Sequence, residues 1–91
     1  MSKIKETAQK LKDKYQAEYN EWSKANPGYV MHGASIKASA LQKAEFADSM
    51  DDLKAMQRTF QIEYKAAEGK PNGFNFMSTA ITELIQTLEN E

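Results

Sequence analysis

The residues that break helices lie in only two short stretches of this 91-residue chain. The two prolines and four glycines occupy positions 27, 28, 33, 69, 71 and 73. Proline lacks a backbone N–H and glycine is costly inside a helix, so both favour turns. The remaining sequence is therefore divided into three long segments, and each of them is free to form helix.

The first segment carries a single apolar stripe, because its apolar residues recur at steps of three or four. They are Ile4, Ala8, Leu11, Tyr15, Tyr19, Trp22 and Ala25. Pro27 restricts the residue before it to extended geometry, and Pro27-Gly28 suits the central pair of a type II turn. We expect a helix that ends near Ala25.

The last segment follows the stretch that runs from Glu68 to Gly73. Gly69 is placed to cap a helix in left-handed geometry, and Pro71 prevents the helix from continuing. The apolar face of a final helix then begins at about Asn75. It consists of Met77, Ala80, Ile81, Leu84, Ile85 and Leu88.

The middle segment, residues 35–68, carries two apolar stripes that lie almost opposite each other at about 100° per residue. The first is Ile36, Ala40, Leu41, Ala44 and Ala47, and the second is Phe46, Met50, Leu53, Met56, Phe60, Tyr64 and Ala67. The segment either breaks near Asp48-Ser49, with Ser49 as N-cap, or remains one helix and buries its second stripe against another subunit. We favour the break.

No segment alternates with a period of two residues, and the chain has a single valine, Val30. Apolar residues make up 41% of the chain and charged residues 27%, which is ordinary for a globular protein. We predict an all-α fold with one domain, residues 1–91. It is a small antiparallel bundle of four helices, or of three with a long middle helix.

The chain contains few of the residues that metal binding and catalysis require. The chain has no cysteine and a single histidine, His32, which excludes structural zinc. Glu45, Asp48 and Asp52 share one side of a helix but lack the Glu-x-x-His pairs of di-iron bundles. No nucleophile motif accompanies His32. We expect a protein without cofactor or metal that is not an enzyme.

The first twenty residues are charged throughout, and no segment approaches the ~20 apolar residues of a membrane span. Together with the absence of cysteine, this predicts a cytoplasmic protein that does not insert in a membrane. Eleven lysines stand against one arginine. That ratio suggests an AT-rich coding sequence, and hence a phage or mobile-element accessory protein.

One candidate site is the corner over residues 26–37, whose backbone N–H groups would face an anion if Ser35 caps the following helix. Side chains that would add a cation, a titratable donor and a stacking face lie nearby. The tentative ligand-binding residues are Tyr29, His32, Gly33, Ser35 and Lys37. A phosphate-bearing small molecule or a nucleotide is the ligand class that such a corner would hold, but its polar groups could equally satisfy one another.

A second candidate is the basic first helix, where five lysines precede several aromatic residues, a pattern found in single-strand binders. They are Lys3, Lys5, Lys10, Lys12 and Lys14. The aromatic residues share the apolar stripe, however, and the single arginine disfavours nucleic-acid recognition. Nucleic-acid binding is therefore a weak alternative.

The hypothesis that the sequence favours is a non-enzymatic protein-interaction or regulatory module that self-associates into a homo-oligomer. Aromatic residues and methionine are enriched at protein interfaces, and the second stripe of the middle segment is rich in both. The tentative interface residues are Phe46, Met50, Leu53, Met56, Phe60 and Tyr64. Sequestration of a small ligand at the 26–37 corner is the alternative.

Overall fold

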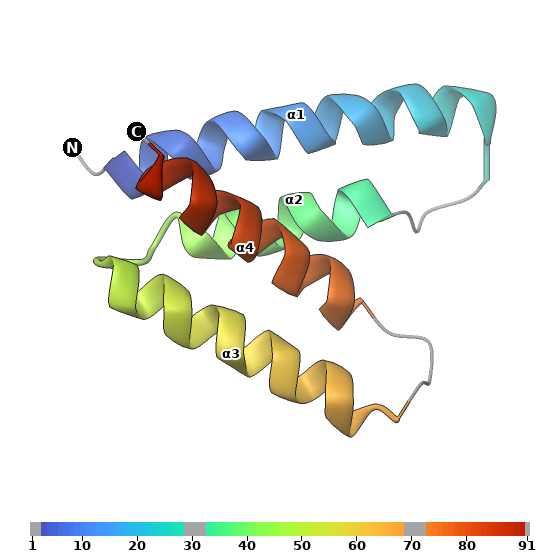
Figure 1. Cartoon of the computed structure of the whole chain (residues 1–91). Helices are drawn as coiled ribbons and strands as arrows, with labels where there is room; N and C mark the ends of the chain where they lie inside the picture. The colour runs from blue at the N-terminus through green and yellow to red at the C-terminus, as the bar shows by residue number, and fades with distance from the viewer. Residues whose placement is uncertain (1–2, 29–32, 69–72, 91) are drawn as a thin grey trace.

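The computed structural model describes residues 3–28, 33–68 and 73–90 and contains four helices in that part of the chain (Figure 1). The helices are α1 (Lys3–Ala25), α2 (Gly33–Ala44), α3 (Met50–Ala66) and α4 (Phe74–Glu89). None of the described residues forms a strand. The predicted all-α fold is confirmed in its four-helix form, because the middle segment breaks between α2 and α3.

The break in the middle segment is made by the predicted cap. Ser49 has extended backbone geometry (φ −154°, ψ 167°), and its hydroxyl oxygen accepts a hydrogen bond from the Asp52 N–H at 3.2 Å. Asp51 and Asp52 occupy the first turn of α3, where carboxylates complement the positive end of the helix dipole. The sequence therefore located this helix start correctly.

The other predicted ends agree closely with the structure. Helix α1 ends at Ala25, and Gly28 has φ +93°, the left-handed geometry that the third residue of a type II turn requires. Helix α4 begins at Phe74, one residue before the predicted start. After α3 the left-handed residue is Glu68 (φ 52°), whereas Gly69, predicted for that role, lies outside the described residues.

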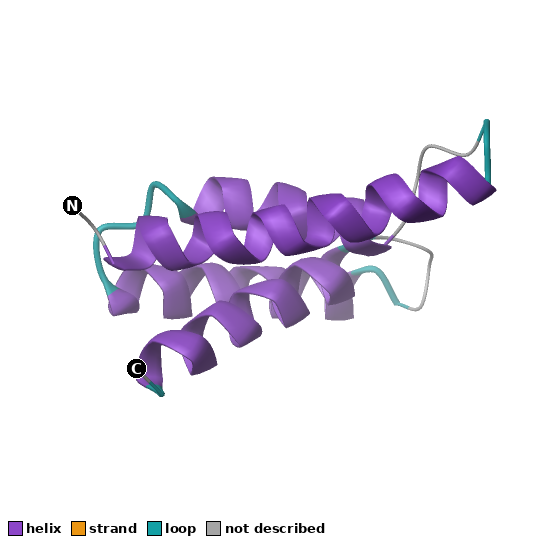
Figure 2. Ribbon diagram, turned by 90° about the horizontal axis from the view of Figure 1, so that it is seen from above, coloured by secondary structure: helices purple, strands orange, loops and turns teal. Residues whose placement is uncertain are grey.

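The four helices form two antiparallel hairpins, α1 with α2 and α3 with α4 (Figure 1). Helix α4 crosses in front of α2 and packs against both α2 and α3, while α3 packs chiefly against α4. The molecule measures 38 × 32 × 20 Å, and its small dimension equals about two helix diameters. Figure 1 shows α3 at one edge of the bundle, and Figure 2 gives the view from above.

The core lies where α2 meets α1 and α4. Helix α2 brings small side chains to these contacts, since Ala34, Ala38, Ala40 and Ala44 are all buried. Alanine side chains let neighbouring helices approach closely. The larger side chains that are fully buried come from α2, α3 and α4, namely Leu41, Leu53, Ile81 and Leu84.

Candidate functional site

The 26–37 corner was the predicted ligand site, and the structure describes only part of it. Tyr29 and His32 lie outside the described residues. Gly33 is the first residue of α2, and a Cβ atom built on it would lie 2.8 Å from the Phe76 ring. The aromatic ring of Phe76 on α4 therefore fills the space beside Gly33, one of the predicted ligand-binding residues.

The other two residues of the predicted ligand site differ from expectation. Helix α2 begins at Gly33, so Ser35 lies in its first turn and does not cap it. The Lys37 ammonium lies 4.9 Å from the centre of the Tyr15 ring. Lys37 is therefore committed to a contact with α1, a contact that its position in the sequence did not reveal.

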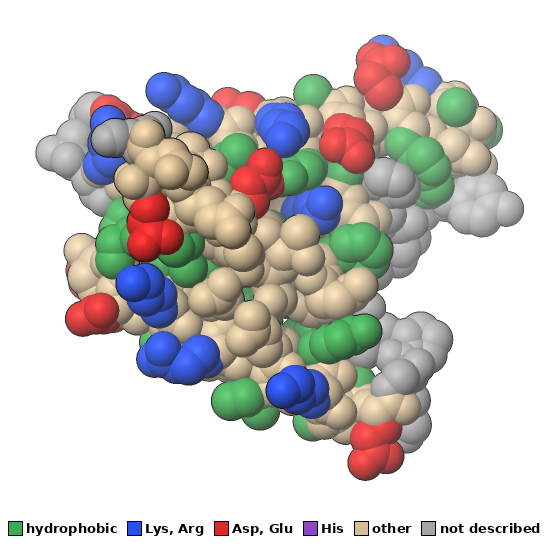
Figure 3. All heavy atoms as spheres, in the orientation of Figure 1, with side chains coloured by type: hydrophobic (Ala, Val, Ile, Leu, Met, Phe, Trp, Pro, Cys, Tyr) green, Lys and Arg blue, Asp and Glu red, His purple; other side chains and the backbone are tan. Residues whose placement is uncertain are grey.

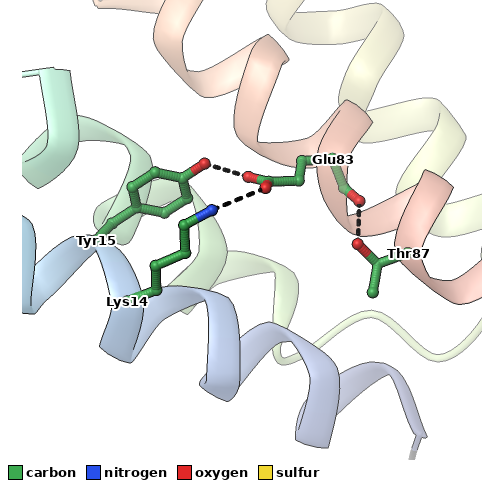
Figure 4. A network of polar contacts seen from close by, with 4 residues as sticks. All are labelled: Lys14, Tyr15, Glu83 and Thr87. Carbon is green, nitrogen blue, oxygen red and sulfur yellow. Dashed lines mark hydrogen bonds and ion pairs between the residues drawn. The ribbon is translucent and has the colours of Figure 1, made fainter.

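Lys37 belongs to a polar cluster that joins α1, α2 and α4, and part of this cluster is drawn in Figure 4. The Tyr15 hydroxyl donates a hydrogen bond to Glu83 Oε1. Lys14 Nζ lies 3.2 Å from Glu83 Oε2 and 4.9 Å from the centre of the Tyr15 ring. The Glu83 carboxylate thus receives both a neutral and a cationic donor from α1.

The environment of this cluster shifts the pKa of both acidic groups. Burial, followed by the hydrogen bond to Glu83 and its negative charge, raises the pKa of the Tyr15 phenol well above its usual range. Burial also acts to raise the pKa of Glu83, but the hydrogen bonds from Tyr15 and Lys14 outweigh it. The positive charges of Lys14 and Lys37 add to that effect, so the pKa of Glu83 is lowered.

These shifts are the reverse of those that acid-base chemistry uses. A carboxylate acting as general acid or base near neutral pH needs a raised pKa, and a nucleophilic tyrosine needs a lowered one. In this cluster the carboxyl group stays ionised and the phenol stays protonated over a wide pH range. The arrangement is that of a structural tie between helices.

The carboxylates considered as a metal-binding face are used separately. Glu45 pairs with Lys12 of α1 at 2.7 Å. The Asp52 carboxylate accepts a hydrogen bond from the backbone N–H of Asp48 at 3.0 Å, as part of the helix cap. In the described ranges, no three His, Asp or Glu side chains converge as a metal site would require.

The lysines of α1 are likewise partly neutralised within the chain. Lys12 pairs with Glu45, and Lys14 pairs with Glu83. Tyr15, one of the aromatic residues that follow these lysines, is buried. The basic helix consequently offers less free charge and less exposed aromatic surface than its sequence suggests.

The six predicted interface residues divide into two groups. Leu53 and Phe60 are buried against α4, where the Phe60 ring centre lies 6.4 Å from that of Phe74. Met50 and Met56 are half-buried and pack against the same core. Phe46 and Tyr64 are exposed, with 82% and 48% of their surface accessible.

This division corrects the expectation that the whole second stripe faces a partner. Because the chain breaks at Ser49, α3 folds back and its apolar stripe packs on α4 of the same chain. Gln57 on this side of α3 also donates a hydrogen bond to the Thr82 hydroxyl of α4 at 2.6 Å. In the folded chain, Leu53 and Phe60 form part of the core.

A different side of α3 is left exposed, and the sequence analysis did not single it out. Ile62 has 66% of its surface accessible, and it lies inside α3, one turn before the helix ends at Ala66. Its neighbours on the same side are exposed as well. We call these four residues the outer face of α3: Ala55, Thr59, Ile62 and Ala66.

The space-filling view shows apolar and basic side chains side by side along α3 at the lower edge of the molecule (Figure 3). The described part of the chain encloses no cavity that would admit a small molecule. Nor does any described helix combine the length and apolar character that a membrane span requires. The exposed apolar side chains of α3 make its surface the candidate functional site.

Comparison of the chain with models of known protein families, with curated proteins and with solved structures finds no match.

Proposed function

We propose that this chain is a non-enzymatic protein-interaction module that acts through self-association. The observation that carries the proposal is the concentration of exposed apolar side chains at the edge helix. Among the described residues, four large apolar side chains are exposed, and three of them lie on α3 or in the turn before it. They are Phe46, Ile62 and Tyr64, and of these three Ile62 lies on the outer face of α3.

Ile62 is the strongest of these three indications. A fully exposed apolar side chain of this size gains about 1.5–3 kcal/mol when it is removed from water. Ile62 lies inside α3, four residues before the helix ends at Ala66, so it does not belong to a cap or a turn. The opposite side of α3 packs against α4, so a second protein surface could cover Ile62 without disturbing the contacts between α3 and α4.

The alternatives have weaker support. The groups of the Tyr15–Glu83 cluster have pKa shifts opposite to those of catalytic residues. Lys37, the only cation proposed for the ligand corner, is held over the Tyr15 ring. A cation engaged in this way is less available to a phosphate at the start of α2.

Sedimentation velocity over a range of protein concentrations tests the proposal. We expect the wild-type protein to associate as its concentration rises and Ile62→Glu to remain monomeric, because the variant would bury a charge in the contact. Ser39→Glu, an exposed position on α2, is the matched control and should associate like the wild type. Circular dichroism checks that all three proteins are folded.

A wild-type protein that stays monomeric up to about 1 mM, a concentration at which even weak complexes form, would contradict self-association. Native mass spectrometry of protein purified gently from cells gives an independent result. A monomer whose mass exceeds that of the chain by a few hundred daltons would instead favour the small-ligand alternative.

A further inference from the structure

The outer face of α3 has the spacing of a short coiled-coil seam. Its residues, Ala55, Thr59, Ile62 and Ala66, are separated by steps of four, three and four. Such alternation keeps side chains on one line of a helix and defines the two core positions of a heptad repeat. Three of the four side chains are small, which allows the backbone of a second helix to approach closely.

This seam lies on the opposite side of α3 from the contact with α4. Phe60 packs against α4, and Ile62 follows two residues later, about 200° further around the helix axis. The exposure of the two side chains agrees, since Phe60 is 9% accessible and Ile62 is 66% accessible. A helix docked on the seam would therefore leave the bundle intact.

Charged side chains of opposite sign border the seam. Asp51, Arg58 and Lys65 follow one another at steps of seven along one border, and Glu63 lies on the other. All four side chains are exposed. Neither Arg58 nor Glu63 forms an ion pair with another described residue of its own chain.

We propose that two copies of this chain pair through the outer faces of α3, with the two helices parallel and related by a two-fold axis that runs along them. This inference rests on the self-association proposed above and specifies its geometry. In a parallel helix pair, the residue that precedes a seam position on one helix faces the residue five positions later on the other. Arg58 and Glu63 have that separation.

The two-fold axis produces this ion pair twice, from Arg58 of each copy to Glu63 of the other. Antiparallel pairing would place like borders together, so that Arg58 of one copy would face Lys65 of the other and repel it. The charge pattern thus favours parallel pairing, while Ile62 from each copy lies at the centre of the contact.

Cysteine cross-linking tests the orientation directly, because the chain has no cysteine of its own. Ala55→Cys and Ala66→Cys each place one thiol on the seam, at opposite ends of it. In the parallel pair each residue meets its own copy across the axis, so each variant alone should form a disulfide-linked dimer under mild oxidation. Gln42→Cys, exposed on α2, is the control and should remain mostly monomeric.

An antiparallel pair gives the opposite pattern. The two single variants would then fail to cross-link alone, and a mixture of them would cross-link efficiently. That result would overturn parallel pairing. If Ile62→Glu still abolishes association, self-association through this face would stand. A wild-type protein that is monomeric in sedimentation would overturn both.

Charge exchange tests the contact between the borders. Arg58→Glu should weaken association about tenfold, because two favourable ion pairs become two repulsive contacts. Glu63→Arg should weaken it to a similar extent. The double variant Arg58→Glu/Glu63→Arg restores complementarity and should recover most of the wild-type affinity, whereas additive losses would overturn the proposed pairing of these two residues.

Discussion

The phenol of Tyr15 and the carboxylate of Glu83 join the first and last helices across 68 positions of the sequence. Helices α1 and α4 share few other contacts, so this hydrogen bond is a principal link between them. Lys14 and Lys37 surround it with positive charge, which favours the ionised carboxylate. The link joins α1 to α4, whereas the other helix of the first hairpin, α2, packs against α4 through the core.

Removal of this hydrogen bond should lower the stability of the fold. We expect Tyr15→Phe to reduce the free energy of unfolding by about 1.5–3 kcal/mol, the range for a hydrogen bond to a charged group. Urea denaturation measures the change. Tyr64→Phe removes the same hydroxyl from an exposed position of α3 and should change stability by less than about 0.5 kcal/mol. Equal effects in both variants would contradict the role of the Tyr15 phenol.

The same pair predicts how stability depends on pH at the acidic end. The pKa of Glu83 is lower in the folded chain than in the unfolded chain. The Glu83 carboxylate therefore contributes its full stabilisation above its pKa in the unfolded chain, about 4.3. This stabilisation is lost as the pH falls through the pKa of Glu83 in the folded chain. Glu83→Gln should flatten the acid limb of the stability profile, and Glu89→Gln, exposed at the end of α4, should leave the limb unchanged.

At alkaline pH, the dependence of stability on pH has the opposite sign. Because the pKa of Tyr15 is raised on folding, its contribution is complete below the unfolded value of about 10 and is lost as the pH rises above that value. We expect the difference in free energy of unfolding between the wild-type protein and Tyr15→Phe to shrink above about pH 10. Unfolding curves measured between pH 8 and pH 11 test this, and a constant difference across that range would be inconsistent with it.

Two phenylalanines that the sequence placed on one stripe should respond very differently to truncation. Phe60→Ala leaves a cavity in the core and should destabilise the fold by about 3–5 kcal/mol. Phe46→Ala acts on a side chain that is 82% accessible and should change stability by about 0.5 kcal/mol or less. Thermal or urea unfolding compares them, and a large effect of Phe46→Ala at low protein concentration would show that the turn before α3 is packed differently.

The cap at the start of α3 gives a further prediction. Ser49→Ala removes the acceptor of the Asp52 N–H and should cost about 1 kcal/mol of stability. Ser39→Ala, at an exposed position inside α2, replaces serine by a better helix former and should be neutral or slightly stabilising. If both variants behave alike, the Ser49 cap is not what breaks the middle segment between α2 and α3.

The sequence by itself determined where the helices are. Pro27, Gly28 and Ser49 act through local geometry and short-range hydrogen bonds, and these are set by residues within a few positions of each other. The apolar stripes of α1 and α4 follow from the same local periodicity, and most of their residues are buried or half-buried. These features were predictable because helix formation depends on neighbours along the chain.

Only the tertiary structure decided which surfaces are used. Whether Leu53 and Phe60 face another subunit or α4 depends on how the chain folds back after Ser49, and no local pattern encodes that direction. The pairing of Tyr15 with Glu83 and the placement of Lys37 over the Tyr15 ring depend in the same way on helix packing. Ile62 is exposed for the same reason, since a helix at the edge of a flat bundle buries only one of its sides.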